Sequence, residues 1–278
     1  MKTRVITAVC MLAVLAPVLI FSQYMIFSVT LGILAAMAVF EVLRVVGLVK
    51  NLWVAIPAVG YALLVPIFTH SRFFSAEESE GFIRLLFLSL VGLLFYLVFL
   101  SVFSKGKISS SQCGAVFMAV AYITVGFSSL GLVRYGKLGV YTFVLIFMGA
   151  WVCDTFAYFC GMLFGKHKLI VELSPKKTVE GSIGGIIFTV LAFILYGVIC
   201  ERCFSLSANY LVLAISGLVL SVISQLGDLF ASLIKREYGV KDYSRLLPGH
   251  GGIMDRFDSI IAVSGAFMVI CMIFPPFC

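Results

Sequence analysis

Long apolar runs alternate with short polar segments along the whole chain. The runs cover residues 5–22, 24–43, 52–69, 82–103, 113–133, 138–164, 182–200, 208–234 and 253–274. A helix needs roughly 20 apolar residues to cross the hydrocarbon core, so this pattern predicts an all-α, polytopic integral membrane protein with about nine transmembrane helices. Membrane-spanning strands would instead be short and alternating, which disfavours a closed barrel.

The first run, residues 5–22, follows Lys2 and Arg4 and so resembles a secretory signal peptide. No small-x-small cleavage site follows it, and we expect a retained first helix. There is no clear internal repeat, and we treat residues 1–278 as one membrane domain. Within it, helices of residues 1–110 are expected to serve packing or lipid contact, and residues 111–278 to carry the chemistry.

The net charge of +7 would suggest a nucleic-acid partner in a soluble protein, but here its placement on the loops matters more. With nine spans, the N-terminus and the loops on its side hold 14 Lys or Arg residues, against 5 in or directly beside the loops of the other side. Positive loops stay in the cytoplasm. We therefore predict a protein of the cytoplasmic (inner) membrane with no nucleic-acid partner, whose two polar segments, residues 165–181 and 235–252, face the cytoplasm.

The eight cysteines lie mostly within or beside apolar runs, where a thiol behaves as a small hydrophobe. Cys200 and Cys203 form a lone CxxC pair without a second pair or a nearby histidine. This spacing favours packing over a zinc or redox site.

Polar side chains form a stripe on the run 208–234. Gln225, Asp228, Ser232 and Lys235 follow one another at i, i+3, i+7 and i+10, which places them on one helical face. This face leads into residues 232–258, a segment dense in charges between two apolar runs.

Three carboxylates are the candidate metal ligands. Asp255 and Asp258 share a face of the last run, and Asp228 would meet them if the two helices pack as neighbours. Oxygen ligands of this kind suit Mg²⁺, which takes one or two carboxylates together with water and substrate phosphates. Structural ion pairs are the alternative. Together with Asp154, these acids could cost on the order of 10 kcal/mol on an insertion scale, a burden that packing alone does not require.

Two polar loops are candidate phosphate sites. One is Pro248-Gly249-His250-Gly251-Gly252, whose glycines let backbone N–H groups approach an anion at a helix N-terminus; a flexible turn is the alternative, and His250 could be a solvated loop residue. The other loop contains Ser174, Lys176, Lys177, Thr178, Glu180 and Gly181. Paired lysines beside hydroxyl donors suit a polyphosphate, although a simple positive-inside anchor would also contain them.

These motifs together resemble the phosphatidate cytidylyltransferases, also called CDP-diacylglycerol synthases. The resemblance rests on a long pattern and on shorter motifs upstream, and it covers roughly the C-terminal half. The pattern is Ser232-x-Ile234-Lys235-Arg236, Lys241-Asp242 and Leu247-Pro248-x-His250-Gly251-Gly252-Ile253-x-Asp255-Arg256-Phe257-Asp258. The shorter motifs are Gln225-Leu226-Gly227-Asp228, Asp154-Thr155-x-Ala157-Tyr158, Gly165-Lys166-x-Lys168 and Ser174-Pro175-Lys176-Lys177-Thr178.

The resemblance implies that CTP and phosphatidate, a membrane lipid, become CDP-diacylglycerol and pyrophosphate. Candidate catalytic residues are then Asp228, Ser232, Lys235, Arg236, Lys241, Asp255 and Asp258, with Asp154 and Asp242 as further candidates. One or two Mg²⁺ ions would be held by the three carboxylates named above, and a homodimer is one assembly left open. A CTP-dependent polyprenol or phytol kinase, or a related lipid-phosphate nucleotidyltransferase, is the alternative enzyme; a transporter that uses intramembrane acids is the alternative outside enzymes.

Overall fold

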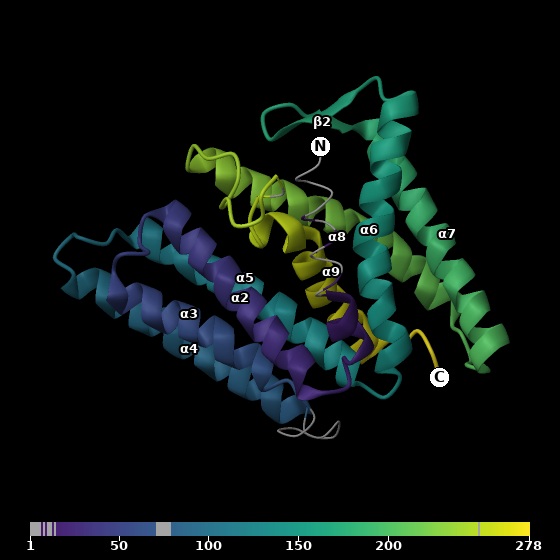
Figure 1. Cartoon of the computed structure of the whole chain (residues 1–278), viewed down its shortest axis with the longest axis horizontal. Coiled ribbons are helices and arrows are strands. Elements are labelled where there is room, and N and C mark those ends of the chain that lie inside the picture. The colour runs from purple at the N-terminus through teal and green to yellow at the C-terminus, as the bar shows by residue number, and fades with distance from the viewer. Residues whose placement is uncertain (1–6, 8, 10–12, 14, 71–78, 250) are drawn as a thin grey trace. The chain divides into compact units, whose positions relative to one another are not determined.

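A computed structural model describes residues 7, 9, 13, 15–70, 79–249 and 251–278. Helices dominate this part of the chain, with one short hairpin between α6 and α7 (Figure 1). In chain order the elements are α2 (Met25–Val46), α3 (Leu52–Ile67), α4 (Ser79–Phe103), α5 (Ser110–Tyr135), α6 (Gly139–Phe164), β1 (Lys168–Ile170), β2 (Ser174–Thr178), α7 (Val179–Phe204), α8 (Tyr210–Glu237) and α9 (Met254–Ile273).

The helices confirm the predicted polytopic, all-α class. In the described part of the chain, seven helices are long and apolar enough to cross a membrane. The predicted third span gives only the 16-residue α3, which at 1.5 Å per residue is shorter than a hydrocarbon core of about 30 Å. The predicted first span lies partly outside the described residues, and the count of nine is not confirmed.

The chain divides into two compact units. The N-terminal unit comprises Met1–Tyr135 and Tyr238–Arg256, and the C-terminal unit comprises Gly136–Glu237 and Phe257–Cys278. The prediction of one membrane domain, with packing helices in residues 1–110 and the chemistry in residues 111–278, stays a prediction.

In the N-terminal unit, α2 packs against α3 and α5, and α4 packs against α5. Phe27, Leu31, Ile123 and Phe127 fill its core and are at most 3% exposed. Gly32 allows the closest approach of α2 to α3, because a Cβ atom there would lie 2.3 Å from the backbone oxygen of Leu63.

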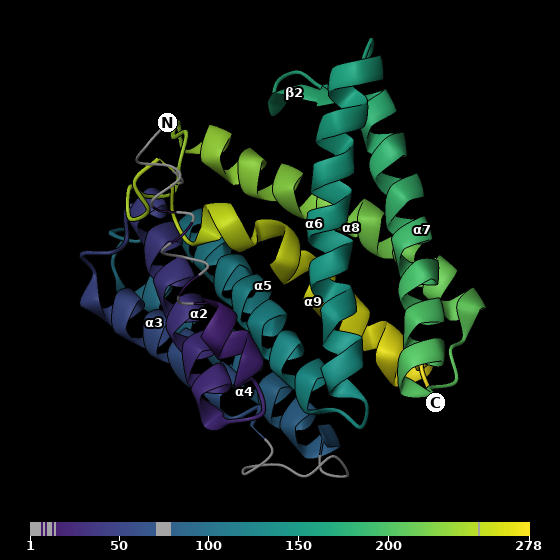
Figure 2. The ribbon, with the colours of Figure 1, turned by 45° about the vertical axis from the view of Figure 1, so that its right-hand side comes forward.

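In the C-terminal unit, α7 packs against both α6 and α8, and α6 also contacts α8. Figure 2 shows α6 and α7 side by side, with the hairpin at one end of the pair. The hairpin replaces the irregular loop expected for residues 165–181: β1 and β2 are antiparallel, with Lys168 opposite Thr178. Because β2 runs directly into α7, the position of α7 fixes the end of the hairpin.

Large apolar side chains cover the outside of the helices in both units. Phe103, Trp151 and Leu211 are each more than half exposed. An apolar exterior of this extent is unusual in a soluble protein and is expected where lipid is the solvent.

Candidate active site

A carboxylate cluster lies in the C-terminal unit, and three different helices supply it. Asp154 comes from α6, Asp228 from α8 and Asp258 from α9, and both Asp154 and Asp258 interact electrostatically with Asp228. Asp258 is 9% exposed, whereas Asp154 is accessible to solvent. Three like charges that act on one another need a cation to balance them.

Lys177, at the end of β2, supplies one cation to this cluster. Its Nζ atom lies 2.6 Å from Oδ2 of Asp228, and the two side chains are 25% and 32% exposed. The buried Nζ has no hydrogen-bond partner among the described residues. The ammonium group pairs with Asp228 and also interacts electrostatically with Asp154, so two of the carboxylates share it.

Small residues bring α6 and α7 close enough to hold the hairpin beside the cluster. A Cβ atom at Gly184 would lie 2.4 Å from Sγ of Cys160, and one at Gly181 would lie 2.5 Å from the backbone oxygen of Ala157. Gly161 lies opposite Gly181, with its Cα atom 3.1 Å from the position of that Cβ atom. The glycines of this segment thus serve helix packing. Gly181 was predicted to bind the nucleotide, and its contact with α6 gives a structural reason for a glycine at this position as well.

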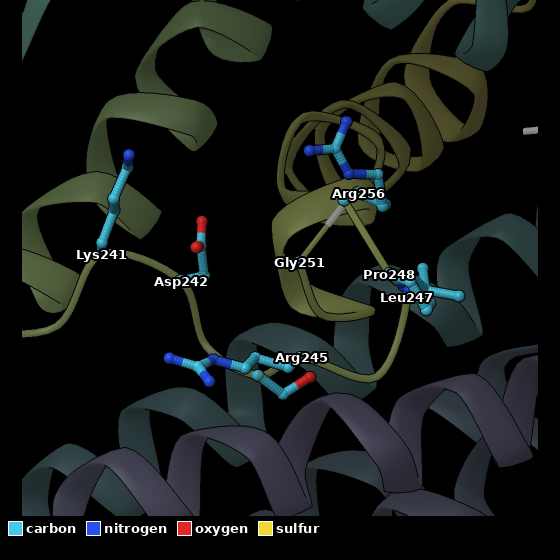
Figure 3. A pocket seen from close by; sticks show the side chains of 9 residues that line it. Lys241, Asp242, Arg245, Leu247, Pro248, Gly251 and Arg256 are labelled. Carbon is cyan, nitrogen blue, oxygen red and sulfur yellow. The ribbon is translucent and has the colours of Figure 1, made fainter. Parts of the chain in front are cut away.

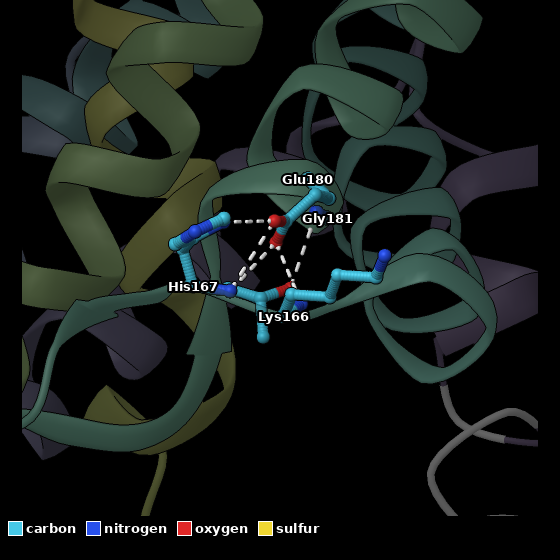
Figure 4. Close-up of polar contacts among 5 residues, drawn as sticks. Lys166, His167, Glu180 and Gly181 are labelled. Atoms are coloured by element: carbon cyan, nitrogen blue, oxygen red, sulfur yellow. Dashed lines mark hydrogen bonds and ion pairs between the residues drawn. The ribbon is translucent and has the colours of Figure 1, made fainter.

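Two other predicted nucleotide-binding residues also have structural partners. Thr178 caps α7, because its Oγ1 accepts a hydrogen bond from N–H of Gly181 at 3.2 Å. The Glu180 carboxylate accepts from N–H of Lys166 at 3.1 Å, from N–H of His167 and from the His167 ring at 2.7 Å (Figure 4). These contacts close the base of the hairpin.

The remaining residues predicted in this loop, Ser174 and Lys176, lie on β2. Lys176 is exposed and Ser174 is half-buried. Both are placed where a solvent-borne ligand can reach them, and their predicted role in nucleotide binding stays a prediction.

The polar stripe on α8 faces the interior of the C-terminal unit. Gln225 is 7% and Ser232 9% exposed, while Asp228 and Lys235 are half-buried. Ser182 of α7 donates its hydroxyl hydrogen to Oε1 of Gln225, which ties the stripe to α7. Lys235 interacts electrostatically with Asp258, and thereby adds a second positive charge near the carboxylates. The neighbouring Arg236 is exposed.

A basic pocket lies in the N-terminal unit, in the loop before α9 (Figure 3). Its volume is about 790 Å³. Three cations and one acid contribute charges to its wall. The lining residues are Lys241, Asp242, Ser244, Arg245, Leu247, Pro248, Gly249, Gly251 and Arg256. Arg245 and Arg256 were not among the predicted site residues, because single arginines in a charged loop carry no spacing signal.

The predicted phosphate cradle is occupied by the protein's own oxygen atoms. N–H of Gly251 donates to the backbone oxygen of Leu247 at 3.1 Å, and N–H of Gly252 donates to Oδ2 of Asp255 at 2.9 Å. The next two N–H groups, at the start of α9, donate to Glu41. The donors predicted for a phosphate are therefore already paired, while His250 lies outside the described residues.

Asp255 has partners of its own in the loop before α9. Its Oδ2 accepts from N–H of Tyr243 and from N–H of Gly252, each at 2.9 Å, so it organises this loop. Its predicted role as a metal ligand stays a prediction. In the C-terminal unit, the third carboxylate that interacts with Asp228 and Asp258 is Asp154.

Carboxylate oxygens are the ligands that Mg²⁺ prefers, and the cluster of Asp154, Asp228 and Asp258 has the required donor chemistry. Among the described residues, however, no three His, Cys, Asp or Glu side chains are arranged as a complete metal site. Lys177 lies against Asp228 instead. The arrangement fits an ion that takes one or two carboxylates and completes its shell with water and substrate phosphates.

Sequence reasoning missed Glu41, a buried carboxylate on α2 that is 4% exposed. It is the one acidic residue of its helix. An ionisable side chain in an apolar span is by default a functional candidate, and that signal was present in the sequence.

Comparison with known proteins agrees with the resemblance seen in the motifs. Residues 2–274 match the model of a family described as "Cytidylyltransferase family". A phosphatidate cytidylyltransferase of Staphylococcus haemolyticus is 36% identical, with 95% of this chain and 96% of the relative covered. The proteins of that name from Staphylococcus saprophyticus and Staphylococcus aureus (strain COL) are 36% and 34% identical, with the same coverage.

Proposed function

Because the chain belongs to the cytidylyltransferase family, we propose that it is a phosphatidate cytidylyltransferase of phospholipid biosynthesis. A phosphate oxygen of phosphatidate forms a bond to the α-phosphorus of CTP, and the bond from that phosphorus to the bridging oxygen of the β-phosphate breaks. CDP-diacylglycerol and pyrophosphate are the products. The cluster of Asp154, Asp228, Asp258 and Lys177 in a chain of apolar helices is the observation that carries the proposal.

The main difficulty of this reaction is charge. The nucleophile is already an anion, so the chain needs no strong general base; it must let a phosphate monoester approach a triphosphate. Positioned cations that neutralise both phosphates therefore supply most of the catalysis. A site that is rich in both acids and lysines is suited to this task, since the acids hold the cations in place.

Among the proposed phosphate-binding residues, Lys177 is the one whose contacts in the structure support its role most directly. Its ammonium group forms an ion pair with Asp228 and also interacts with Asp154. It lies at the end of β2, the strand on which Lys176 is exposed and Ser174 is half-buried. We assign to Lys177 an ion pair with the β- or γ-phosphate of CTP. That phosphate would either displace Asp228 from the ammonium group or bind the ammonium group together with Asp228. Lys235 and Ser232, on the inward face of α8, would contact phosphate oxygens beside the carboxylates.

A divalent ion fits the same carboxylates. Asp228 and Asp258, with Asp154, would hold one or two Mg²⁺, and bound Mg²⁺ would supply further positive charge against the phosphates.

In the pocket before α9, Lys241, Arg245 and Arg256 give an excess of positive charge that suits a substrate phosphate.

The chain is a multi-pass membrane protein, and its site is assigned to the cytoplasmic side of the inner membrane. The excess of Lys and Arg on the loops that carry the site supports this orientation. CTP is a cytoplasmic metabolite, so this orientation is also the one that the reaction requires.

Purified protein in mixed micelles, supplied with CTP and phosphatidate, tests the function. We expect pyrophosphate release, and label from α-³²P-CTP in the lipid product. Transfer of label from γ-³²P-CTP to a lipid would identify a kinase instead, and absence of both would overturn the proposal. Asp228→Asn serves as the active-site control, and its turnover should fall to background.

A further inference from the structure

Glu41 lies on α2, a helix for which we predicted only packing or lipid contact. Its carboxylate nevertheless makes three hydrogen bonds to the loop that precedes α9. Oε1 accepts from N–H of Ile253 at 2.9 Å and from the hydroxyl of Ser244 at 2.6 Å, and Oε2 accepts from N–H of Met254 at 2.9 Å. Both oxygens of a side chain that is 4% exposed are thus engaged.

Two of these contacts are made at the N-terminus of α9, where backbone N–H groups lack partners within the helix. A carboxylate there is also favoured by the helix dipole. Hydrogen bonds to a charged group are shorter and roughly twice as strong as those between neutral groups. Glu41 is therefore a strong anchor for the loop.

Gly252 fits this anchor closely. A Cβ atom at this position would lie 2.4 Å from Oε2, 2.5 Å from Oε1 and 2.6 Å from Cδ of Glu41. Its backbone does not have a positive φ angle, unlike Gly251 with φ of +84°. A glycine is thus required at position 252 because a side chain there would collide with the Glu41 carboxylate. At position 251 a glycine is required because the backbone has a positive φ angle.

We propose that Glu41 is a positioning residue for cytidylyl transfer. Its carboxylate fixes Ser244, Ile253 and Met254, and thereby holds Arg245 and Arg256 at the wall of the basic pocket. The tests of this proposal that measure activity rest on the proposed function. It assigns to the N-terminal helices a direct part in shaping the loop that carries the signature residues.

The test compares Glu41→Ala, Gly252→Ala and the double variant in the cytidylyl transfer assay. Each single change should lower kcat about ten-fold or more, with the KM for CTP changed less than three-fold. The double variant should be no more than two-fold slower than Glu41→Ala, because the Cβ atom added at position 252 then enters the space that the Glu41 carboxylate has vacated. Additive losses, or a Glu41→Ala variant within two-fold of the parent, would overturn the proposal.

Two further variants separate positioning from a general loss of stability. Ser28→Ala removes a part-buried hydrogen bond from the same helix to α5, between Ser28 and the Tyr135 hydroxyl at 2.9 Å, and should leave kcat within two-fold of the parent. Glu41→Gln keeps the size of the side chain and one acceptor oxygen, so its kcat should lie between those of the parent and Glu41→Ala. A Ser28→Ala variant as slow as Glu41→Ala, or a Glu41→Gln variant with no gain over Glu41→Ala, would refute positioning by these hydrogen bonds.

Hydrogen–deuterium exchange provides a readout that does not depend on the reaction. In Glu41→Ala the amides of Ile253 and Met254 should exchange at least ten-fold faster than in the parent, while those in the middle of α5 stay unchanged. Unaltered exchange at Ile253 and Met254 refutes the anchor. If the parent makes no CDP-diacylglycerol but the exchange result holds, the proposed function fails and the anchoring role of Glu41 survives.

Discussion

Replacing Lys177 with methionine would leave the Asp228 carboxylate among like charges without its ion-pair partner. The two charges lie 2.6 Å apart and attract by about 6 kcal/mol at an effective dielectric constant of about 20. Desolvation offsets most of this: removing one partner of a fully buried pair costs about 3 to 5 kcal/mol, and an exposed pair contributes about 0 to 1. The side chains are 25% and 32% exposed, so we expect Lys177→Met to destabilise the protein by about 1 to 3 kcal/mol.

Thermal unfolding in nanodiscs measures this effect, with Lys176→Met as the matched control for stability because Lys176 is exposed on the same strand. The double variant Lys177→Met/Asp228→Asn removes the unpaired charge and should regain most of the lost stability. Its turnover should nevertheless stay at background, since both proposed phosphate and metal contacts are gone. A double variant as unstable as the sum of the two single variants would refute the reasoning.

Further predictions concern the metal, the packing of the helices and the two acids of α9. EDTA should abolish pyrophosphate release and added Mg²⁺ should restore it; activity that survives EDTA would remove the divalent ion from the proposal. Gly184→Ala should destabilise the protein by about 1 to 3 kcal/mol through collision with Cys160, whereas Gly92→Ala, where nothing lies within 4 Å, should be near neutral in thermal unfolding. Asp258→Asn should stop turnover without loss of stability, because it relieves repulsion, while Asp255→Asn should lower the unfolding temperature by weakening the hydrogen bonds of two N–H groups.

The helices could be predicted from the sequence because hydrophobic length alone decides which segments cross a bilayer. The predicted run 138–164 and the observed α6, Gly139–Phe164, differ by one residue at one end. The hairpin was missed because its strands are only three and five residues long and mostly polar. Its pairing depends on the closure of residues 166–167 by Glu180, a contact that no periodicity reveals.

The candidate site could be predicted only in part, because helical spacing shows which residues share a face and not which faces meet. Gln225, Asp228, Ser232 and Lys235 share one face of α8, as their spacing predicted, and the structure adds that this face is buried or half-buried. Asp154 lies more than 70 residues upstream of Asp228, and only the packing of α6 against α8 brings it into reach.

The two acids at the start of α9 show why identity of residue and spacing do not fix a role. Asp255 and Asp258 are one helical turn apart, yet Asp255 accepts two backbone N–H groups of the preceding loop, while Asp258 interacts with the acids of α6 and α8. A carboxylate that accepts hydrogen bonds from backbone N–H groups satisfies them and adopts a structural role. The same side chain one turn later interacts with Asp154, Asp228 and Lys235, and its Oδ1 accepts from N–H of Ser259 at 2.8 Å. It is therefore the acid of α9 that lies among the carboxylates of α6 and α8, and the one to which we assign the metal in the proposed reaction.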